Sequence, residues 1–253
     1  MKSSRPITAV IITYNESENI ADCIKSLKDI VKEVIVIDAN SVDETIDIAK
    51  GLGAKVFTKD WTTYGDQKNF GSDQASFDWV LSIDADERVD VDLKEELLNL
   101  ELQENYLYSI NVKTNYLGKW IRYCGWYPSY KKRLYNKSAV RWNSDLVHEA
   151  LITQGDHKHS KLQGNLLHYS YPTIERHHQK IERYAKLTAQ KWMQQKKAPS
   201  ILKKIFGPSF RFIKTYILRL GILDGKEGFM ISKMSFLLVK EQLRYFKQIK
   251  QRS

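Results

Sequence analysis

Two carboxylates separated by one residue follow a run of apolar residues in the first third of the chain. Asp84 and Asp86 come directly after Trp79–Ile83, which we predict to be a buried strand. Side chains at positions i and i+2 leave a strand on the same side, so both carboxylates point the same way. Hard divalent cations prefer oxygen ligands of this kind. The pattern favours a cation site, and the alternative is that this acidic run only begins the next helix.

Polar residues also follow two other predicted strands. Ile7–Thr13 leads into Tyr14-Asn15-Glu16, and a second strand over residues 33–38 ends at Asp38 and leads into Asn40. Asp38 comes too early to cap the following helix, so it is placed to accept hydrogen bonds from a base or a ribose. The glycine-rich loop of a dinucleotide-binding fold is missing after the first strand, which argues against NAD or FAD.

Strand and helix signals alternate over the first 90 residues. Such alternation produces right-handed βαβ units and a parallel sheet, whose ligands gather at the carboxyl ends of the strands. The three polar clusters fall at those ends. The predicted strands are Ile7–Thr13, Glu33–Asp38, Ala54–Lys59 and Trp79–Ile83, and the predicted helices begin near Ile20 and cover Asp43–Leu52 and Gln67–Ala75.

The remaining chain lacks this alternation. Residues 105–170 are dense in Tyr, Trp and basic residues, and we predict extra strands and long loops there that cover a site. From Thr173 the pattern becomes helical, and Pro199 and Gly207-Pro208 are expected to interrupt it. The predicted domains are residues 1–172, with a nucleotide-binding half over 1–104 and an acceptor side over 105–172, and a basic helical extension over 173–253.

The formal charge of +10 is unevenly distributed. Residues 1–150 carry 19 Lys and Arg against 24 Asp and Glu, whereas residues 151–253 carry 21 against 6. This basic C-terminal part indicates an anionic partner, and the alternative is a well-solvated helical surface. Residues 206–251 also combine Phe, Tyr, Ile and Leu with Lys and Arg, which fits peripheral contact with an anionic membrane face or packing against the α/β domain.

Other features of the composition concern the compartment. The two cysteines, Cys23 and Cys124, form no CxxC pair, which fits a reducing environment. The apolar run Ile7–Ile12 is too short for a signal peptide, and no stretch of about 18 apolar residues predicts a spanning helix. We expect a cytoplasmic protein. No nucleic-acid-binding signature is present, so we expect no nucleic-acid partner.

Three segments together resemble a known enzyme family. Ile11–Glu16, Val36–Thr45 and Trp79–Glu87 resemble, in order and spacing, the family 2 glycosyltransferases of GT-A fold. That resemblance implies a Rossmann-like nucleotide-diphospho-sugar transferase domain with a mostly parallel central sheet. Further segments resemble the branch that includes lipopolysaccharide inner-core β-glucosyltransferases. They are Tyr64–Asn69, Gly125–Pro128, Val147–Glu149 and Leu223–Gly225.

The resemblance implies roles for individual residues. The residues implied to bind the nucleotide sugar are Thr13, Tyr14, Asn15, Glu16, Asp38, Asn40, Lys68, Asp84, Ala85 and Asp86. Asp38 would hold the base, and Lys68 would offer a cation to a phosphate where the family often has Arg. Asp86, with Asp84 beside it, would hold Mg²⁺ or Mn²⁺ at the diphosphate. His168 is a candidate for completing the metal shell, although a lone histidine is more often structural.

An inverting transfer needs a base for the acceptor hydroxyl and a cation for the departing diphosphate. The resemblance places a catalytic carboxylate at Glu149. The alternative is that Glu149 pairs with Arg141 or His148, and Asp145 is a second candidate base. The remaining histidines lack the spacing of a ligand set and are predicted to be surface residues. They are His157, His159, His177 and His178.

Aromatic and basic residues gather between residues 120 and 133. Aromatic faces stack on sugar rings and Arg or Lys binds phosphates, so this mixture suits an anionic glycolipid acceptor. The alternative is an aromatic core. The candidate acceptor-binding residues are Trp126, Tyr127, Arg133 and His148.

We therefore expect an inverting, metal-dependent transfer of a hexose from a nucleotide diphosphate sugar, with UDP-glucose as the leading donor. The expected acceptor is a lipopolysaccharide core sugar at the cytoplasmic face of the inner membrane. Two alternatives stay open: a glycosyltransferase of another cell-surface polysaccharide, and a non-catalytic sugar- or nucleotide-binding protein. A nucleotidyltransferase would show a glycine-rich basic loop near the first strand, which the sequence lacks.

Overall fold

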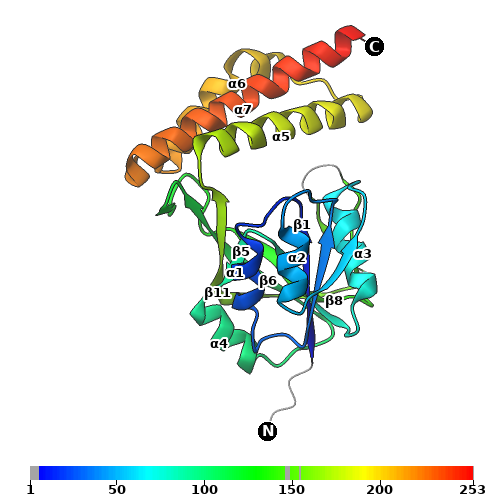
Figure 1. Ribbon diagram of the computed structural model, residues 1–253. Helices are drawn as coiled ribbons and strands as arrows, with labels where there is room; N and C mark the ends of the chain where they lie inside the picture. The colour runs from blue at the N-terminus through cyan, green and yellow to red at the C-terminus, as the bar shows by residue number, and fades with distance from the viewer. Residues whose placement is uncertain (1–5, 146–148, 154, 253) are drawn as a thin grey trace. The chain divides into compact units, whose positions relative to one another are not determined.

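The computed structural model of the protein describes residues 6–145, 149–153 and 155–252 (Figure 1). They form two compact units. The first unit comprises the chain up to Val112 together with Tyr130–His168, and the second comprises Lys113–Ser129 together with the chain from Tyr169 onward. Each buried apolar cluster lies wholly within one unit.

Within the described residues, nine strands form the main sheet, in the order β3-β2-β1-β4-β8-β6-β11-β5 with β7 paired to β6. Strands β3, β2, β1 and β4 run parallel. In contrast, β8 is antiparallel to β4 and to β6. The strands of this sheet are β1 Ile7–Thr13, β2 Glu33–Asp38, β3 Lys55–Thr58, β4 Trp79–Asp84, β5 Glu87–Val89, β6 Tyr106–Tyr116, β7 Lys119–Trp120, β8 Tyr130–Asn136 and β11 Lys158–Tyr171. A separate antiparallel pair consists of β9 Val140–Trp142 and β10 Leu151–Thr153.

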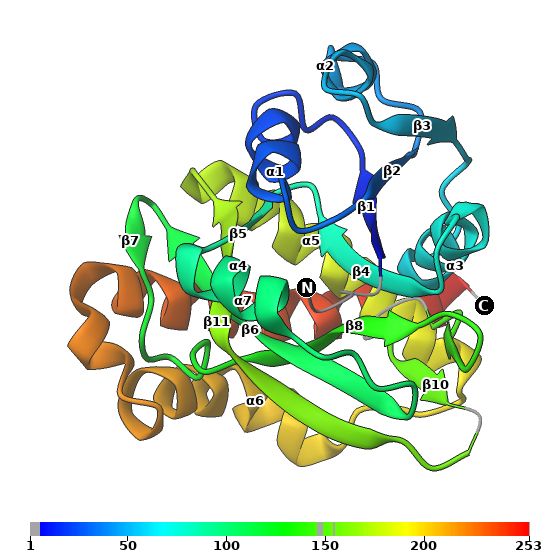
Figure 2. The ribbon, with the colours of Figure 1, turned by 90° about the horizontal axis from the view of Figure 1, so that it is seen from below.

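Helices cover both faces of the parallel part of this sheet. Alternate residues of a strand face opposite sides, and in β1 Ala9 and Ile11 join one buried cluster while Val10 joins the other. The first cluster includes residues of α1 and α2, and the second is lined by α3. Figure 2 shows β1 and β2 running between α1 and α3. The helices of this unit are α1 Ile20–Ser26, α2 Thr45–Gly51, α3 Tyr64–Gln74 and α4 Val91–Asn99.

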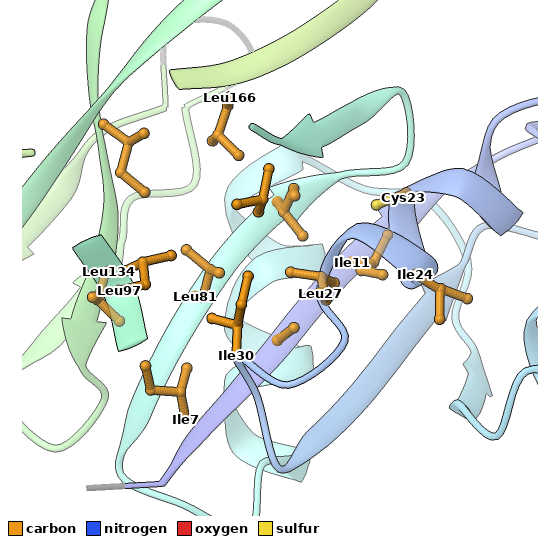
Figure 3. Close-up of a cluster of buried hydrophobic side chains, with 14 of the residues drawn as sticks. Ile7, Ile11, Cys23, Ile24, Leu27, Ile30, Leu81, Leu97, Leu134 and Leu166 are labelled. Carbon is orange, nitrogen blue, oxygen red and sulfur yellow. The ribbon is translucent and has the colours of Figure 1, made fainter. Parts of the chain in front are cut away.

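The larger buried cluster holds the strands that lead to the polar ends (Figure 3). Cys23, Ile24 and Leu27 from the α1 region share it with Ile11 of β1 and Leu81 of β4. Burying each such aliphatic side chain contributes about 1.5–3 kcal/mol relative to leaving it exposed. The carboxyl ends of β1 and β4 are therefore anchored by a packed core directly beneath them.

The predicted α/β class is confirmed. The predicted strands over residues 7–13 and 33–38 coincide with β1 and β2, and the extra strands expected over residues 105–170 are present. The predicted helix over residues 67–75 begins earlier, at Tyr64. Its N-cap is Thr63, whose side chain accepts a hydrogen bond from the N–H of Asp66.

The second unit is mainly helical, and Figure 1 shows α7 lying between α5 and α6. Pro199 separates α5 from α6, as predicted. The predicted break at Gly207-Pro208 is wrong, because Pro208 lies inside α6, which begins after its N-cap Ser200. In the described part of the chain, no helix combines the length and apolarity needed to cross a membrane. The helical segments are α5 Ile174–Gln194, α6 Ile201–Ile213, the π-helical turn η1 Lys214–Leu218, the 3₁₀ turn η2 Gly221–Asp224 and α7 Gly225–Arg252.

Asp224 explains why Lys113–Ser129 belongs to the second unit, whereas the sequence places this segment in the first domain. The buried Asp224 carboxylate accepts hydrogen bonds from the backbone N–H groups of Arg122, at 3.2 Å, and Tyr123, at 2.8 Å. Lys119 donates to the backbone carbonyl of Asp224 at 2.6 Å. A residue just before α7 therefore fixes the segment that follows β6.

His177 was expected at the surface, and this prediction is wrong. Only 6% of the residue is exposed, and its Nδ1 lies 3.0 Å from the hydroxyl of Tyr116. Its ring also contacts those of Tyr171 and Trp126. The loss of water around the ring, together with the nearby charges of His178 and Lys180, lowers the pKa of His177 to about 4. The imidazole is therefore neutral in the folded protein at pH values where the unfolded chain is protonated.

This lowered pKa predicts a pH dependence of stability. Between pH 6.5 and pH 4 the unfolded chain binds a proton that folded His177 does not, so the free energy of unfolding falls as the pH falls. The full loss is about 3 kcal/mol for a shift of this size. Urea unfolding at pH 7 and pH 4 should show a smaller pH-dependent loss for His177→Phe than for the wild type. His159→Gln is the control, since His159 is exposed and is not among the groups that lower the pKa of His177, so this variant should keep the wild-type loss. An equal loss in all three proteins would contradict the prediction.

Candidate functional site

The register of the parallel strands brings three polar strand ends together. Thr13 of β1 pairs with Asp38 of β2, and Ile12 pairs with Asp84 of β4. The backbone N–H of Ala39 donates to the carbonyl of Thr13 at 3.0 Å, which extends the pairing beyond the strands. The predicted gathering of these residues at one edge of the sheet is therefore present.

Hydrogen bonds join the loop after β1 to the loop after β2. The N–H of Asn15 donates to Oγ of Ser41 at 2.8 Å, and Oδ1 of Asn15 accepts from the N–H of Val42 at 2.9 Å. The N–H of Glu16 donates to Oγ1 of Thr45 at 2.9 Å. Asn15 has a left-handed φ of 52°, a conformation that asparagine tolerates better than most residues. The two loops therefore form one rigid rim.

Asp38 lies at the base of this rim and is fully buried. One of its carboxylate oxygens accepts from the N–H of Ser41 at 2.7 Å, and the other accepts from the Ser41 hydroxyl at 2.5 Å. Asn40 donates to Asp60 at 2.7 Å. In contrast, Tyr14 is 54% exposed. Asp38 and Asn40 thus shape the loop, while Tyr14 offers an open aromatic face.

Thr13 carries an unmet hydrogen-bonding group at the same edge. Its Oγ1 is buried and has no hydrogen-bond partner among the described residues. A buried hydroxyl without a partner costs free energy, and such a group in a folded protein calls for an explanation. A ligand at the strand ends is one group that would satisfy it.

A buried arginine joins the two carboxylates on either side of the Ala85-Asp86 turn. Nη2 of Arg133 lies 2.9 Å from Oδ2 of Asp84 and 2.6 Å from Oε1 of Glu87. The Glu87 side chain is only 1% exposed, and its other oxygen accepts from the N–H of Asp84 at 2.9 Å. Burial opposes ionisation of Asp84, but the charges of Arg133 and Lys68 outweigh it and hold the pKa of Asp84 well below its ordinary value. Asp84 therefore stays ionised.

Lys68 connects this cluster to Glu149. Its ammonium lies 2.8 Å from Oε1 of Glu149 and 3.6 Å from Oδ1 of Asp84. It also lies over the ring of Trp142, 4.6 Å from the ring centroid. The Lys68 side chain is 2% exposed, whereas 23% of the Glu149 side chain reaches the surface. The predicted phosphate ligand is thus enclosed between two carboxylates and an indole ring.

Asp86 and His168 form a separate pair. Nε2 of His168 lies 3.1 Å from Oδ2 of Asp86, and both side chains are partly exposed. His168 reaches this position because β11 pairs with β5, which sets His168 opposite Glu87. Ala85 is buried in the core between the two aspartates. The structure therefore brings together the histidine and the aspartate that the sequence predicts as metal ligands.

The comparisons with known proteins identify the family. The model of the family described as glycosyl transferase family 2 matches residues 8–151. An uncharacterized glycosyltransferase of Rickettsia prowazekii is 32% identical over 246 residues, covering 90% of this chain and 82% of the relative. The chain belongs to glycosyl transferase family 2. Its α/β sheet with a helical C-terminal part is the predicted GT-A fold.

Two further proteins are similar to this chain. The lipopolysaccharide core biosynthesis glycosyltransferase LpsC of Rhizobium meliloti is 30% identical, covering 83% of this chain and 80% of LpsC. A crystal structure of glucosyl-3-phosphoglycerate synthase from Mycobacterium tuberculosis is 27% identical, with a TM-score of 0.34. That match covers 46% of each chain, so this protein spans less than half of the solved one.

The net charge of the carboxylate cluster decides whether a metal ion would fit there. With every carboxylate ionised, Asp84, Asp86, Glu87 and Glu149 carry four negative charges, and Arg133 and Lys68 carry two positive charges. The described cluster thus has a formal charge of −2 with a neutral His168, which a divalent cation would neutralise. No three His, Cys, Asp or Glu side chains in the described residues gather as a complete metal site. A cation here would draw further ligands from substrate or water, as Mg²⁺ usually does.

Of the predicted acceptor-binding residues, one lies in the carboxylate cluster and two lie in the second unit. Arg133, predicted to bind the acceptor, is buried in the carboxylate cluster. Trp126 and Tyr127 belong to the second unit, where Trp126 contacts the rings of Tyr116 and Tyr171. His148 lies outside the described residues. Arg141 pairs with Asp73, so the predicted alternative pairing of Glu149 with Arg141 is not the one that forms.

Sequence reasoning missed two residues of the site. Glu87 looked like one more acidic residue in the run that follows β4, and only the fold shows that it is buried against Arg133. Trp142 carried no motif, and the structure places its ring under the ammonium of Lys68. The family motif includes Glu87, so its position directly after Asp-x-Asp was the available signal. No comparable signal marks Trp142.

Arg133→Gln should destabilise the first unit. The substitution leaves Glu87 buried without its cation, and breaking a buried ion pair typically costs about 3–5 kcal/mol. Urea unfolding at neutral pH measures the change in the free energy of unfolding. Lys131→Gln is the control, because Lys131 is exposed and should change stability by less than about 0.5 kcal/mol. Equal stability of the two variants would show that the cluster does not hold the fold together.

Gly65→Ala tests how closely α3 packs against the backbone that follows β9. A Cβ at Gly65 would lie 1.9 Å from the carbonyl oxygen of Asn143, so this backbone must move. Overpacking of this kind costs about 1–3 kcal/mol. Gly51→Ala is the matched control, because a Cβ at Gly51 meets nothing within 4 Å and a helix prefers alanine. We expect thermal unfolding to show a loss of stability for Gly65→Ala alone, and the same result for both variants would contradict this.

Proposed function

We propose that this protein is an inverting glycosyltransferase that moves a hexose from a nucleotide diphosphate sugar to a glycolipid acceptor. The observation that carries the proposal is the carboxylate cluster at the carboxyl end of β4, beside the ends of β1 and β2, in a chain that belongs to family 2. Carboxyl ends of parallel strands are where α/β proteins bind nucleotides. The cluster, in turn, has the charge that a cation-bridged diphosphate requires.

The donor would lie along the rim and the metal pair. Tyr14 and the unpaired hydroxyl of Thr13 are assigned to the nucleoside, with the loop around Asp38 and Asn40 forming its support. Asp86 and His168, with Asp84 beside them, would hold Mg²⁺ or Mn²⁺. When bound, this cation stabilises the negative charge that builds on the departing nucleotide diphosphate.

Glu149 is the proposed base. Its carboxylate would accept the proton of the acceptor hydroxyl while that oxygen forms a bond to the anomeric carbon, and the bond from this carbon to the diphosphate oxygen breaks. Lys68 holds one oxygen of Glu149 at 2.8 Å and lies near Asp84, so we assign it a positioning role between the base and the metal site. Arg133 holds Asp84 from the other side.

The proposed acceptor is a lipopolysaccharide core sugar, and the proposed donor is UDP-glucose. The similarity to LpsC over 83% of this chain supports the first assignment. The excess of Lys and Arg over residues 151–253 also suits an anionic glycolipid presented at the cytoplasmic face of a membrane. Transfer to another cell-surface polysaccharide is the second candidate, because family membership alone does not distinguish the two.

The first experiment incubates the protein with a panel of nucleotide sugars and Mn²⁺ or Mg²⁺ and measures release of the nucleotide diphosphate. We expect metal-dependent hydrolysis of one donor. Asp86→Asn should lower this rate by roughly 100-fold or more, because it removes a charged metal ligand. Asp92→Asn, at an exposed position of α4, is the control and should leave the rate unchanged.

Glu149→Gln separates the base from the donor site. It should bind the donor with nearly the wild-type affinity in calorimetry but transfer sugar to an acceptor about 100-fold more slowly or worse. Loss of donor binding in Glu149→Gln would assign Glu149 to the donor site instead. If the wild-type protein binds none of the donors, the proposed function is wrong.

A further inference from the structure

Helix α6 of the second unit carries its large apolar side chains on the outside. In the described structure no residue of α6 is buried, and its exposed Ile, Leu and Phe residues are 45–71% exposed. The apolar exposure continues through η1 and η2. We call the following residues the apolar face: Ile201, Leu202, Ile205, Phe206, Phe210, Ile213, Ile217, Leu218, Leu220, Ile222 and Leu223.

The side of α6 nearest its neighbours includes Gly207 and Lys203, together with Phe212. A Cβ at Gly207 would lie 3.3 Å from Val239 of α7, which marks the line of contact between these helices. The ammonium of Lys203 lies 4.4 Å from the ring centroid of Trp192 in α5. A surface helix of a soluble protein normally turns its apolar stripe inward. Helix α6 instead leaves six of its large apolar residues exposed, so these residues need another partner.

Aromatic residues next to the apolar face contact one another at the surface. Phe212 and Tyr216 pack against Phe229 of α7, with ring centroids 5.8 Å apart in each pair. Phe229 is itself 46% exposed, so these three rings lie at the surface as well. Two further aromatic residues of α6, Phe206 and Phe210, are 61% and 57% exposed. The buried interior of the unit is formed by other residues, Ile181, Ala185, Ile231 and Met234, and the apolar face is additional to it.

Basic residues surround the apolar face. Between residues 196 and 226 the chain has eight Lys and Arg and one acidic residue, Asp224. The Asp224 carboxylate is buried and occupied by backbone N–H groups, so it does not offset the charge at the surface. Exposed cations include Lys204, Arg211 and Lys226. The face is thus an apolar surface rimmed by positive charge.

We propose that this face binds the surface of an anionic lipid bilayer. Apolar side chains would enter the boundary between head groups and acyl chains, while Lys and Arg reach the anionic head groups. A second copy of the chain fits less well, because it would bring two surfaces of the same strong positive charge together. The site lies on α6, η1 and η2, within residues 201–223, while the long helix α7 packs between its neighbours.

An environment-sensitive fluorophore tests this directly. Both native cysteines are buried, so Phe206→Cys provides one reactive exposed thiol for labelling. Its emission should shift to the blue with phosphatidylcholine vesicles that contain phosphatidylglycerol and should stay unchanged with vesicles of phosphatidylcholine alone. Val91→Cys, in the first unit and 72% exposed, is the matched label that should not respond.

Vesicle pelleting measures how much the apolar and the basic residues each contribute to membrane binding. Leu202→Ser, Phe206→Ser and Phe210→Ser combined should weaken binding by roughly tenfold or more. The matched control combines Val91→Ser, Leu98→Ser and Ile152→Ser, which removes three exposed apolar residues from the first unit and should bind as the wild type. These positions are exposed, so circular dichroism should confirm that both variants are folded.

Charge is tested in the same assay. A variant that combines Lys204→Gln, Arg211→Gln and Lys226→Gln should bind about 100-fold more weakly at low salt. Each of these cations near the bilayer surface is expected to contribute a similar amount to the free energy of binding. Lys25→Gln, Lys28→Gln and Lys50→Gln combined, all exposed in the first unit, should have little effect.

Wild-type binding by the apolar variant, or equal binding to neutral vesicles, would overturn the proposal. Self-association in sedimentation that disappears in the apolar variant would assign the face to a second copy instead.

Discussion

The buried guanidinium of Arg133 is the interaction on which the site depends. It comes from β8, the first antiparallel strand beside the parallel ones, and holds Asp84 and Glu87 at the end of β4. Asp84 and Glu87 lie close together beside an apolar core, where carboxylates repel each other and have lost their hydration. Without the charge of Arg133 this arrangement would be strongly unfavourable. Arg133 thereby holds both ends of the Asp84-Ala85-Asp86-Glu87 turn, and Oδ2 of Asp86 lies 3.1 Å from Nε2 of His168.

Lys68 links this buried cluster to Glu149, the proposed base. The first unit combines a parallel nucleotide-binding half with antiparallel strands added at its edge, and each part supplies charges to one cluster. The carboxylates of Asp84 and Asp86 come from β4 and the turn after it, Arg133 from β8, Lys68 from α3 and His168 from β11. Neither half alone could neutralise its own buried charges. The site is therefore complete only where the parallel and antiparallel parts of the sheet meet.

Much of this arrangement could be predicted from local sequence. Strand β1 and strand β2 are β-branched runs whose ends are marked by polar residues, and the Asp-x-Asp position followed from the apolar run before it. Pairings between distant residues could not be predicted. Nothing in the sequence near Arg133 distinguishes it from Lys131 and Lys132, and its burial follows only from the register of β8 against β4. His177 was misjudged for the same reason, because its partner Tyr116 is 61 residues away.

The second unit shows a different limit of sequence reasoning. The spacing of apolar residues in the sequence indicates that one face of α6 is apolar, but it does not indicate whether that face points toward the interior of the unit. The usual inference, that the apolar stripe is the core, fails because Gly207 and the stem of Lys203 lie on the side of α6 nearest its neighbours. An inverted stripe is stable only if the unit already has a sufficient interior, and α5 and α7 supply one through Ile181, Ala185 and Phe246. Packing between α5 and α7 thus frees α6 to present its apolar face and its cations to a partner of opposite charge.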